Sequence, residues 1–265
     1  MSLHKKLQEL KSILSKQPGV VVALSGGVDS TLLLKLAKDA LPNRVIAVTA
    51  SSPIHPRSEL SFAQQIARKL GVKHIIYQSG EMGRERFTSN PRNRCYYCKR
   101  ALFGQLKKIA AQYGYTVIEG SNASDLHEDR PGLRALRALK IVSPFIDASV
   151  HKHEIRKLAR EYGLPNWDKP AMPCLATRVP FGRRITRHLL NRIESAEQYL
   201  KKLKVTQVRV RDHDPIARIE VSPRDFEKVL RNRTKITNHL RKLGYTYITL
   251  DLAGYQTGSL SRQKK

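Results

Sequence analysis

The chain has 265 residues, 40% of them hydrophobic, which is enough for one large domain or two smaller ones with buried cores. No apolar run approaches the roughly 18 residues of a membrane span, and residues 1–6 contain no apolar signal core, so we expect a cytoplasmic protein without a membrane anchor. The formal net charge of +27 comes from 49 Lys and Arg against 22 Asp and Glu spread along the chain, and it fits either a nucleic-acid partner or a site for small anions.

The first part of the chain alternates strand and helix patterns. Hydrophobic periodicity predicts helices over 3–16, 30–40, 58–70 and 151–162, another helix that ends near 114, and strands over 19–24, 45–49, 74–77, 115–120 and 141–145. This alternation at short spacing indicates βαβ units, hence an α/β fold with a parallel sheet covered by helices on both faces. Ligands bind such sheets at the carboxyl ends of the strands, so the residues that follow the strands are the first candidates for a site.

Two irregular segments follow these strands. Residues 127–132 are polar, and we expect them to form a site loop rather than part of the core. Residues 164–185 have no periodicity and several prolines, and a long irregular segment in a compact protein is usually functional or disordered. Cys174 and Arg178 lie within it, which favours a functional segment.

From 186 onward the pattern changes. A long helix over about 186–203 precedes two strands, two short helices and a last strand over 245–250, an order that predicts a small α+β domain. We therefore expect a nucleotide-binding domain over 1–163, a site loop or linker over 164–185, and a second domain over 186–265 for substrate binding or oligomerisation.

The first strand of that second domain, over 207–211, alternates two residue types. Val208 and Val210 face inward, and Arg209 and Arg211 share the outward face. Two guanidinium groups on one face are consistent with a solvated strand surface or with an anion-binding surface.

The most informative stretch joins the strand 19–24 to the helix 30–40. It reads Ser-Gly-Gly-Val-Asp-Ser over 25–30 and is followed by Thr31. The glycines permit a tight turn, and the hydroxyls of Ser25, Ser30 and Thr31 face the same concavity as the free N–H groups of the helix start. A glycine turn with a serine cap is the simpler alternative, but six such residues in this context favour an anion site. A Walker loop would need a Lys after the last glycine, so this is a different phosphate loop.

Three cysteines occur, Cys95, Cys98 and Cys174, and an odd number argues against a disulfide framework. The C-x-x-C pair could be a redox pair, half of a zinc site or part of an iron–sulfur site, and a zinc site would need a fourth ligand such as His151 or His153. Buried, unligated thiols and a persulfide role are further alternatives. Three thiolates suit a [4Fe–4S] cluster that leaves one iron open to bind a sulfur, which is the interpretation we favour.

The loop over 25–30 resembles the PP-loop of the ATP pyrophosphatases, which split ATP into AMP and pyrophosphate while they adenylate a substrate oxygen. Taken with the rest of the chain, the sequence resembles the LarE family, PP-loop sulfur transferases that build the nickel-pincer nucleotide cofactor of lactate racemase. The segments that carry this resemblance are 25–30, 96–97, 130–133, 174–182, 209–211, 216–220 and 250–254, with Glu197.

The resemblance implies an enzyme that adenylates the carboxylates of pyridinium-3,5-biscarboxylic acid mononucleotide and inserts sulfur. One branch of the family sacrifices a loop cysteine, and the other carries a [4Fe–4S] cluster on three cysteines with a bound sulfide. This chain fits the second branch, because it has Cys95, Cys98 and Cys174. It departs from the sacrificial pattern, because the loop cysteine is displaced and Pro173 stands next to it. The fold implied is the parallel-sheet PP-loop domain of adenine nucleotide alpha hydrolases, followed by the smaller α+β domain.

The resemblance also implies site residues, cofactors and partners. The reacting groups would be Asp29, Cys174, Glu197, Arg209, Arg211 and Glu220, with Asp225 at a position where the alignment is ambiguous. The residues for Mg²⁺ and ATP would be Ser25, Gly26, Gly27, Asp29, Ser30, Thr31, Thr49 and Arg130, and the cluster ligands Cys95, Cys98 and Cys174. A homo-oligomer is implied, a hexamer or another assembly built from trimers.

Two other functions compete with this one. A [4Fe–4S]-dependent tRNA thiolase of the same superfamily would use the same loop and cysteines, and the charge of +27 favours it. The absence of further cysteine pairs for zinc and of a recognisable RNA-binding module argues against it. A non-catalytic ATP-binding regulator would need the loop but would have no use for three cysteines.

Overall fold

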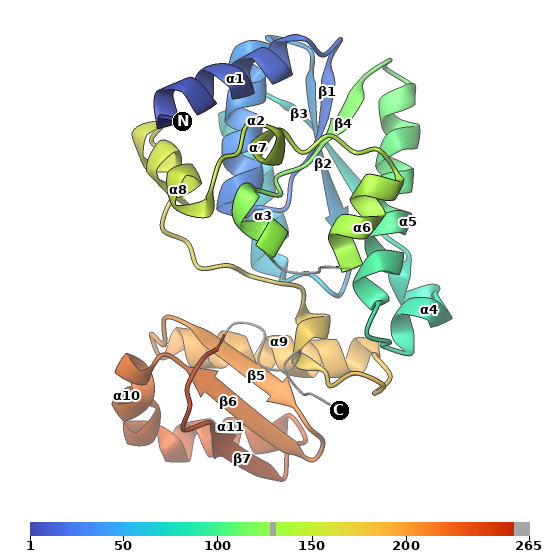
Figure 1. Cartoon of the computed structure of the whole chain (residues 1–265). Helices are drawn as coiled ribbons and strands as arrows, with labels where there is room; N and C mark the ends of the chain where they lie inside the picture. The colour runs from blue at the N-terminus through green and yellow to red at the C-terminus, as the bar shows by residue number, and fades with distance from the viewer. Residues whose placement is uncertain (128–130, 257–265) are drawn as a thin grey trace. The chain divides into compact units, whose positions relative to one another are not determined.

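The computed structural model describes residues 1–127 and 131–256, which form two compact units (Figure 1). The N-terminal unit comprises Met1–Glu81 and Asn93–Met172, and the C-terminal unit comprises Met82–Arg92 and the residues from Pro173 onward. Residues 164–172 thus pack with the N-terminal unit, whereas the segment 82–92 crosses to the other unit. The domain boundaries expected at 163 and 186 stay predictions.

The N-terminal unit is built on a four-stranded parallel sheet in the order β3-β2-β1-β4, which confirms the predicted α/β class. Its strands are β1 (Val20–Ala23), β2 (Val45–Ser51), β3 (Lys73–Gln78) and β4 (Thr116–Ile118). Its helices are α1 (Leu3–Ser15), α2 (Val28–Ala40), α3 (Arg57–Lys69), α5 (Arg94–Ala111), α6 (Pro131–Ala138), α7 (Pro144–Asp147) and α8 (Lys152–Glu161), with a short 3₁₀ turn at Ala123–His127. A second 3₁₀ turn, Glu81–Gly83, begins with the last residue of the stretch Met1–Glu81 and continues into the segment 82–92.

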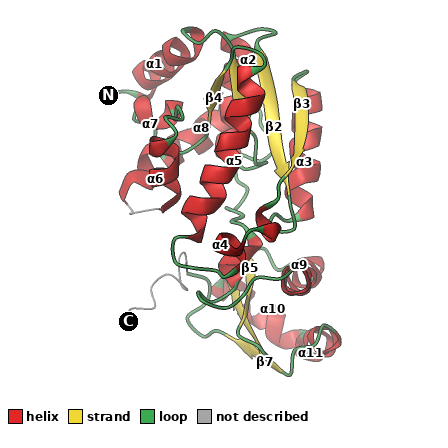
Figure 2. Cartoon of the chain, turned by 90° about the vertical axis from the view of Figure 1, so that its right-hand side faces the viewer, coloured by secondary structure: helices red, strands yellow, loops and turns green. Residues whose placement is uncertain are grey.

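Helices cover both faces of this sheet (Figure 2). Val20 and Val22 pack into a core that includes residues of α1, α2, α3, α7 and α8, while Val21 packs into a second core with residues of α5 and α6. Because neighbouring side chains of a strand point to opposite faces, an unbroken apolar run is what a strand buried on both sides needs. The sequence of β1 therefore explains its central place in the sheet.

Two predicted segments of this unit differ from the structure. The strand expected over 141–145 is reduced to one bridge between Ile118 and Val142, because Pro144 has no N–H to pair and instead begins α7. The loop expected over 127–132 is partly helical, since α6 begins at Pro131 and buries Leu133 and Leu136 against α5. Arg130 lies outside the described residues.

The C-terminal unit confirms the predicted second fold. It has a three-stranded sheet in the order β5-β6-β7, antiparallel between the first pair and parallel between the second. Its elements are α4 (Glu85–Thr88), the 3₁₀ turn η3 (Leu175–Arg178), α9 (Arg187–Lys202), β5 (Val208–Asp212), β6 (Ile216–Val221), the 3₁₀ turn η4 (Pro223–Asp225), α10 (Phe226–Arg231), α11 (Arg233–Lys242) and β7 (Tyr247–Leu250). One core joins side chains of α9, α10 and α11 to those of the sheet, among them Leu200, Val208, Val229 and Leu240.

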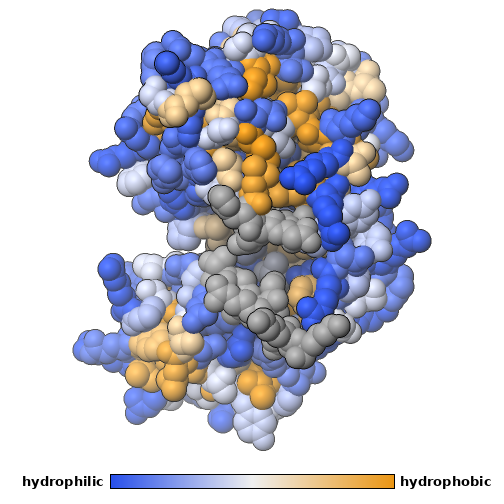
Figure 3. All heavy atoms as spheres, viewed as in Figure 1, coloured by the Kyte–Doolittle hydropathy of each residue, from blue (hydrophilic) through white to orange (hydrophobic). Residues whose placement is uncertain are grey.

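Most of the surface seen in Figure 3 is hydrophilic, with hydrophobic residues in smaller groups between polar ones. Among the described residues, no helix combines the length and the hydropathy that a membrane crossing requires.

Candidate active site

The loop between β1 and α2 is shaped by its own hydroxyl groups. The backbone N–H of Ser25 donates to Ser30 Oγ at 3.1 Å, and Ser30 Oγ donates to the carbonyl of Gly27 at 3.1 Å. The N–H of Gly27, the N-cap residue of α2, lies 3.3 Å from Ser25 Oγ. The first N–H groups of a helix have no intrahelical partner and carry the positive end of its dipole, so the loop and the helix start together form a cradle for an anion.

Gly26 allows the loop to turn at this point. Its φ is +81°, and an added Cβ would lie 2.8 Å from the carbonyl oxygen of Glu59 on α3. A side chain is excluded there both by the backbone conformation and by the neighbouring helix.

Thr31 and Thr49 lie behind the loop. Both are buried. The hydroxyl of Thr49 donates to the carbonyl of Leu24 at 2.7 Å, so the 2.8 Å contact with His74 must use a proton on His74 Nε2. These contacts support the end of β1, and the direct role of the two threonines with nucleotide stays a prediction.

Asp29 stands in the first turn of α2 within a polar cluster. Its Oδ2 lies 2.5 Å from Lys152 Nζ at the start of α8, and its Oδ1 accepts from Asn122 Nδ2 at 3.4 Å. Asn122 is oriented in turn by the N–H of Ser124, which donates to its Oδ1 at 3.0 Å. One carboxylate, one ammonium and one amide therefore meet at the edge of the anion cradle, after β1 and β4.

This cluster fits Mg²⁺ carried by a phosphate. Magnesium is usually held by one or two carboxylates together with substrate phosphates, and Asp29 supplies one such carboxylate. In the described ranges 1–127 and 131–256, no group of three or more His, Cys, Asp and Glu side chains is placed to hold a metal ion.

The predicted cluster ligands divide between the two units. Cys95 and Cys98 lie three residues apart in the first turn of α5, so their side chains share one side of that helix. Cys174 lies directly before η3 in the C-terminal unit. All three are half-buried. Two thiols on one helical turn near a helix N-terminus suit thiolate ligands, and the three-cysteine cluster stays a prediction.

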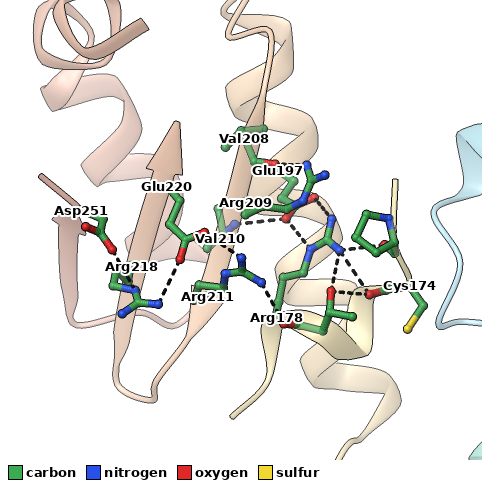
Figure 4. A network of polar contacts seen from close by, with 12 residues as sticks. Cys174, Arg178, Glu197, Val208, Arg209, Val210, Arg211, Arg218, Glu220 and Asp251 are labelled. Atoms are coloured by element: carbon green, nitrogen blue, oxygen red, sulfur yellow. Dashed lines mark hydrogen bonds and ion pairs between the residues drawn. The ribbon is translucent and has the colours of Figure 1, made fainter. Parts of the chain in front are cut away.

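Arg178 organises the segment that carries Cys174 (Figure 4). The guanidinium group is fully buried and donates to the carbonyls of Pro173 at 2.7 Å and Cys174 at 3.2 Å. Its Nε and Nη2 bind the two carboxylate oxygens of Glu197 on α9 at 2.8 and 3.0 Å. The backbone N–H of Val210 completes the site by donating to Glu197 Oε1 at 3.1 Å.

The arginines of β5 join the same network. Arg211 donates to the carbonyl of Thr177 at 2.9 Å and to Glu220 Oε2 at 2.7 Å, while Arg218 binds the other oxygen of Glu220 at 3.0 Å. Arg209 lies over the ring of Tyr255, and its burial, together with the nearby charge of Arg178, lowers its pKa.

The alternation of β5 is as predicted, but the outward placement of its arginines is wrong. Arg209 is 1% exposed and Arg211 is 5% exposed, because Arg209 packs over the ring of Tyr255 and Arg211 reaches the carbonyl of Thr177 in η3. A solvated strand surface is therefore excluded.

Asp225 has local structural contacts. Its Oδ2 accepts from the N–H and the hydroxyl of Thr206 at 3.0 and 2.8 Å, and its Oδ1 accepts from Lys228 at 3.0 Å. Burial alone would raise the pKa of this carboxyl, but these hydrogen bonds lower it. The carboxylate joins the start of β5 to α10.

Several polar residues were not among the predicted site residues. These are Asn122, Lys152, Asn166, Lys169 and Arg178. Asn122 follows β4, the last strand of the parallel sheet. Its position at the carboxyl edge of that sheet could therefore have marked it as a candidate site residue. Asn166, Lys169 and Arg178 lie in the irregular segment 164–185 already suspected of function, whereas nothing local distinguishes Lys152.

The chain is similar to a family model and to several known proteins. Residues 2–127 match the sequence model of the NAD synthase family. The pyridinium-3,5-bisthiocarboxylic acid mononucleotide synthase of Lactiplantibacillus plantarum is 34% identical over 98% of this chain and 95% of its own length. An uncharacterised protein of Synechocystis is 40% identical over 98% of both chains. The glutamine-hydrolysing GMP synthase of Aeropyrum pernix is 27% identical over 74% of this chain and 42% of its own length.

The parallel sheet, the Ser25–Ser30 loop and these similarities define an ATP-using enzyme of the PP-loop superfamily. Within that superfamily the chain belongs to the LarE family, since its similarity to a member runs through both units.

Proposed function

We propose that this protein is an ATP-dependent sulfur transferase that adenylates the carboxylates of pyridinium-3,5-biscarboxylic acid mononucleotide and inserts sulfur for the nickel-pincer cofactor. The observation that carries the proposal is 34% identity over 98% of the chain to a synthase of the corresponding bisthiocarboxylic acid mononucleotide. The hydrogen-bonded Ser25–Ser30 loop supports the ATP-dependent half, and the three cysteines support the sulfur half.

In the adenylation step a substrate carboxylate oxygen attacks the α-phosphorus of ATP. The bond from that phosphorus to the bridging oxygen breaks, and pyrophosphate leaves with the electron pair. The N–H groups at the start of α2 and the ammonium of Lys152 stabilise the charge on the departing pyrophosphate. Asp29 holds Lys152 in place and offers a carboxylate for Mg²⁺.

Adenylation makes AMP the leaving group in place of an oxide, so a sulfur nucleophile can replace it at the carbonyl carbon. A [4Fe–4S] cluster bound by Cys95, Cys98 and Cys174 would supply a sulfide on the iron that no cysteine holds. Arg178 fixes the backbone carbonyls next to Cys174 and so sets where that thiol is presented.

The Cys174→Ala variant tests this assignment. It should lose formation of the thiocarboxylate while pyrophosphate release from ATP continues, because adenylation precedes the sulfur step in which Cys174 is proposed to act. Both products are measured in the same anaerobic reaction, together with iron and acid-labile sulfide in each protein. A variant that still makes thiocarboxylate over repeated turnovers would refute the role of Cys174.

The charge of the chain favours a second candidate, a tRNA thiolase. Residues 228–250 contain no Asp or Glu, and their cations are Lys228, Arg231, Arg233, Lys235, Arg241 and Lys242. An RNA substrate would be retained through phosphate contacts that weaken as salt rises. Two results together would favour tRNA over the mononucleotide as the substrate. Nucleic acid would copurify with the protein and be released by salt, and sulfur would be incorporated into tRNA in the presence of ATP.

We also propose a homo-oligomer, a hexamer or another assembly built from trimers, in line with the family. Light scattering on the purified protein measures its mass directly, and a monomer at working concentration would contradict the expectation.

A further inference from the structure

The turn that follows α8 lies against the PP-loop. Asn166 is 2% exposed, and its Nδ2 donates to the carbonyl of Gly26 at 3.2 Å and to Thr31 Oγ1 at 3.1 Å. Lys169 Nζ lies 3.4 Å from the same carbonyl and 2.8 Å from a carboxylate oxygen of Glu59. Two side chains of this one turn thus reach the carbonyl of the same loop glycine.

This turn is itself held in position. Arg156 on α8 donates to the carbonyl of Trp167 at 2.9 Å and to that of Lys169 at 2.8 Å. The N–H of Lys169 donates to the carbonyl of Asn166 at 3.2 Å. Asn166 therefore reaches Gly26 from a fixed backbone rather than from a free loop.

The orientation of the Asn166 amide follows from its two acceptors. Nδ2 is the only group on the side chain that can donate, and both neighbours on its side are oxygen atoms. The reversed amide would place its oxygen against the carbonyl of Gly26. The position consequently requires a donor, and a carboxylate of nearly the same shape would be repelled.

Anchoring the Gly26 carbonyl also orients a backbone N–H group of the anion site formed by the loop 25–30 and the start of α2. In a planar trans peptide the C=O and the N–H point in opposite directions, so a fixed Gly26 carbonyl also fixes the N–H of Gly27. That N–H belongs to the N-cap residue of α2 and lies on the side of Ser25 Oγ. Gly26 has no Cβ and adopts φ of +81°, so without such contacts this peptide would have more freedom to rotate than any other in the loop.

We propose that Asn166 is a positioning residue of the PP-loop. It orients the Gly26–Gly27 peptide so that the loop is ready for the pyrophosphate group of ATP, and Lys169, held by Glu59, supports the same carbonyl. This inference rests on the proposed function, because it takes pyrophosphate as the group that the loop receives.

The test is direct binding of inorganic pyrophosphate and of AMP to the full-length protein by isothermal titration calorimetry. Asn166→Asp should weaken pyrophosphate binding about tenfold or more, through loss of the hydrogen bond and repulsion of two oxygens. AMP binding should remain within about twofold, since AMP lacks the pyrophosphate group, and the KM for ATP should rise with the pyrophosphate dissociation constant. Asn238→Asp, an exposed change of the same kind on α11, is the matched control.

Unchanged pyrophosphate affinity in a folded Asn166→Asp protein would overturn the inference, and so would an equal loss for AMP. If that variant does not fold, Asn166→Ser replaces it, because a serine hydroxyl is too short to reach both acceptors and the same direction is expected. Pyrophosphate binding needs no turnover. A wild-type protein that binds pyrophosphate but makes no thiocarboxylate would therefore count against the proposed function and leave this inference standing.

Discussion

At the scale of single residues, ion pairs in this protein are expected to contribute differently to folding stability, depending on whether the pair is buried or exposed. Arg178 and Glu197 are both inaccessible and satisfy each other through two hydrogen bonds. Arg231 and Glu227 also pair, but three quarters of each side chain is exposed. Burial removes the water that would otherwise compensate for a lost partner, so only the first pair is expected to matter for folding.

Replacing Glu197 tests this difference. Glu197→Ala leaves the Arg178 guanidinium buried without its counterion and should destabilise the C-terminal unit by about 3–5 kcal/mol. Glu227→Ala, on the exposed pair, is the control and should melt close to wild type. Thermal unfolding followed by circular dichroism measures both variants. Equal melting temperatures would show that the buried pair contributes no more than the exposed one.

Asp29 is the residue on which we expect adenylation to depend. Asp29→Asn removes the negative charge that holds Lys152 and serves Mg²⁺, so pyrophosphate release should fall by about a hundredfold or more. Asp39→Asn is the matched control, because Asp39 lies in the last turn of the same helix and pairs with the partly exposed Lys35. Release is measured with a coupled pyrophosphate assay. A rate in Asp29→Asn similar to that of Asp39→Asn would remove Asp29 from the mechanism.

At the scale of elements, the site depends on close contact between the end of β4 and the start of α2. Gly120 follows β4, and a Cβ on it would lie 3.1 Å from the backbone nitrogen of Ser30 and 3.2 Å from Asp29 Cβ. The parallel sheet places the ends of β1 and β4 side by side, and the absence of a side chain at Gly120 lets the helix start approach.

A methyl group at this contact should separate the two elements. Gly120→Ala is expected to cost about 1–3 kcal/mol in unfolding free energy and to weaken ATP binding, because the start of α2 must shift. Gly104→Ala, within α5 where nothing lies within 4 Å of an added Cβ, should instead add about 0.5–1 kcal/mol by helix propensity. Chemical denaturation and ATP titration measure both effects. Similar behaviour of the two alanines would mean that the contact is not tight.

At the scale of the whole molecule, partly buried histidines make stability depend on pH. Burial lowers the pKa of His55, His74, His213 and His239 below the ordinary value of 6.5. As pH falls below that value, these histidines become protonated in the unfolded chain while they remain mostly neutral in the folded chain. The unfolded state then binds more protons, so the free energy of unfolding decreases with falling pH.

We expect the melting temperature to fall as pH is lowered from about 7.5 to about 5.5. His74→Gln should make this dependence shallower, whereas His4→Gln at the exposed N-terminal helix should leave it nearly unchanged. Differential scanning calorimetry across this range measures the slope. A melting temperature that stays constant, or rises, on acidification would contradict the assignment.

The local patterns of the sequence were sufficient for much of this protein. The α/β class, the parallel strands, the anion loop after β1 and the second α+β unit all follow from periodicity, glycine placement and element order. These features are determined by neighbours in the chain, which is why they can be recognised without a structure. The segment 141–145 shows the limit of such local patterns. It is strand-like in sequence, but only Val142 forms a bridge, because Pro144 begins α7 instead.

Only the tertiary structure decided which polar side chains contact the loop over 25–30 and which are buried elsewhere. The amide of Asn166 meets a carbonyl 140 residues away, and the ammonium of Lys152 meets a carboxylate 123 residues away. The same is true of Arg209 and Arg211, which are buried by contacts with Tyr255 and with η3. The sequence by itself determined where the candidate anion site lies, because a turn and a helix start are local. The groups that orient it come from distant segments, and folding alone brings them together.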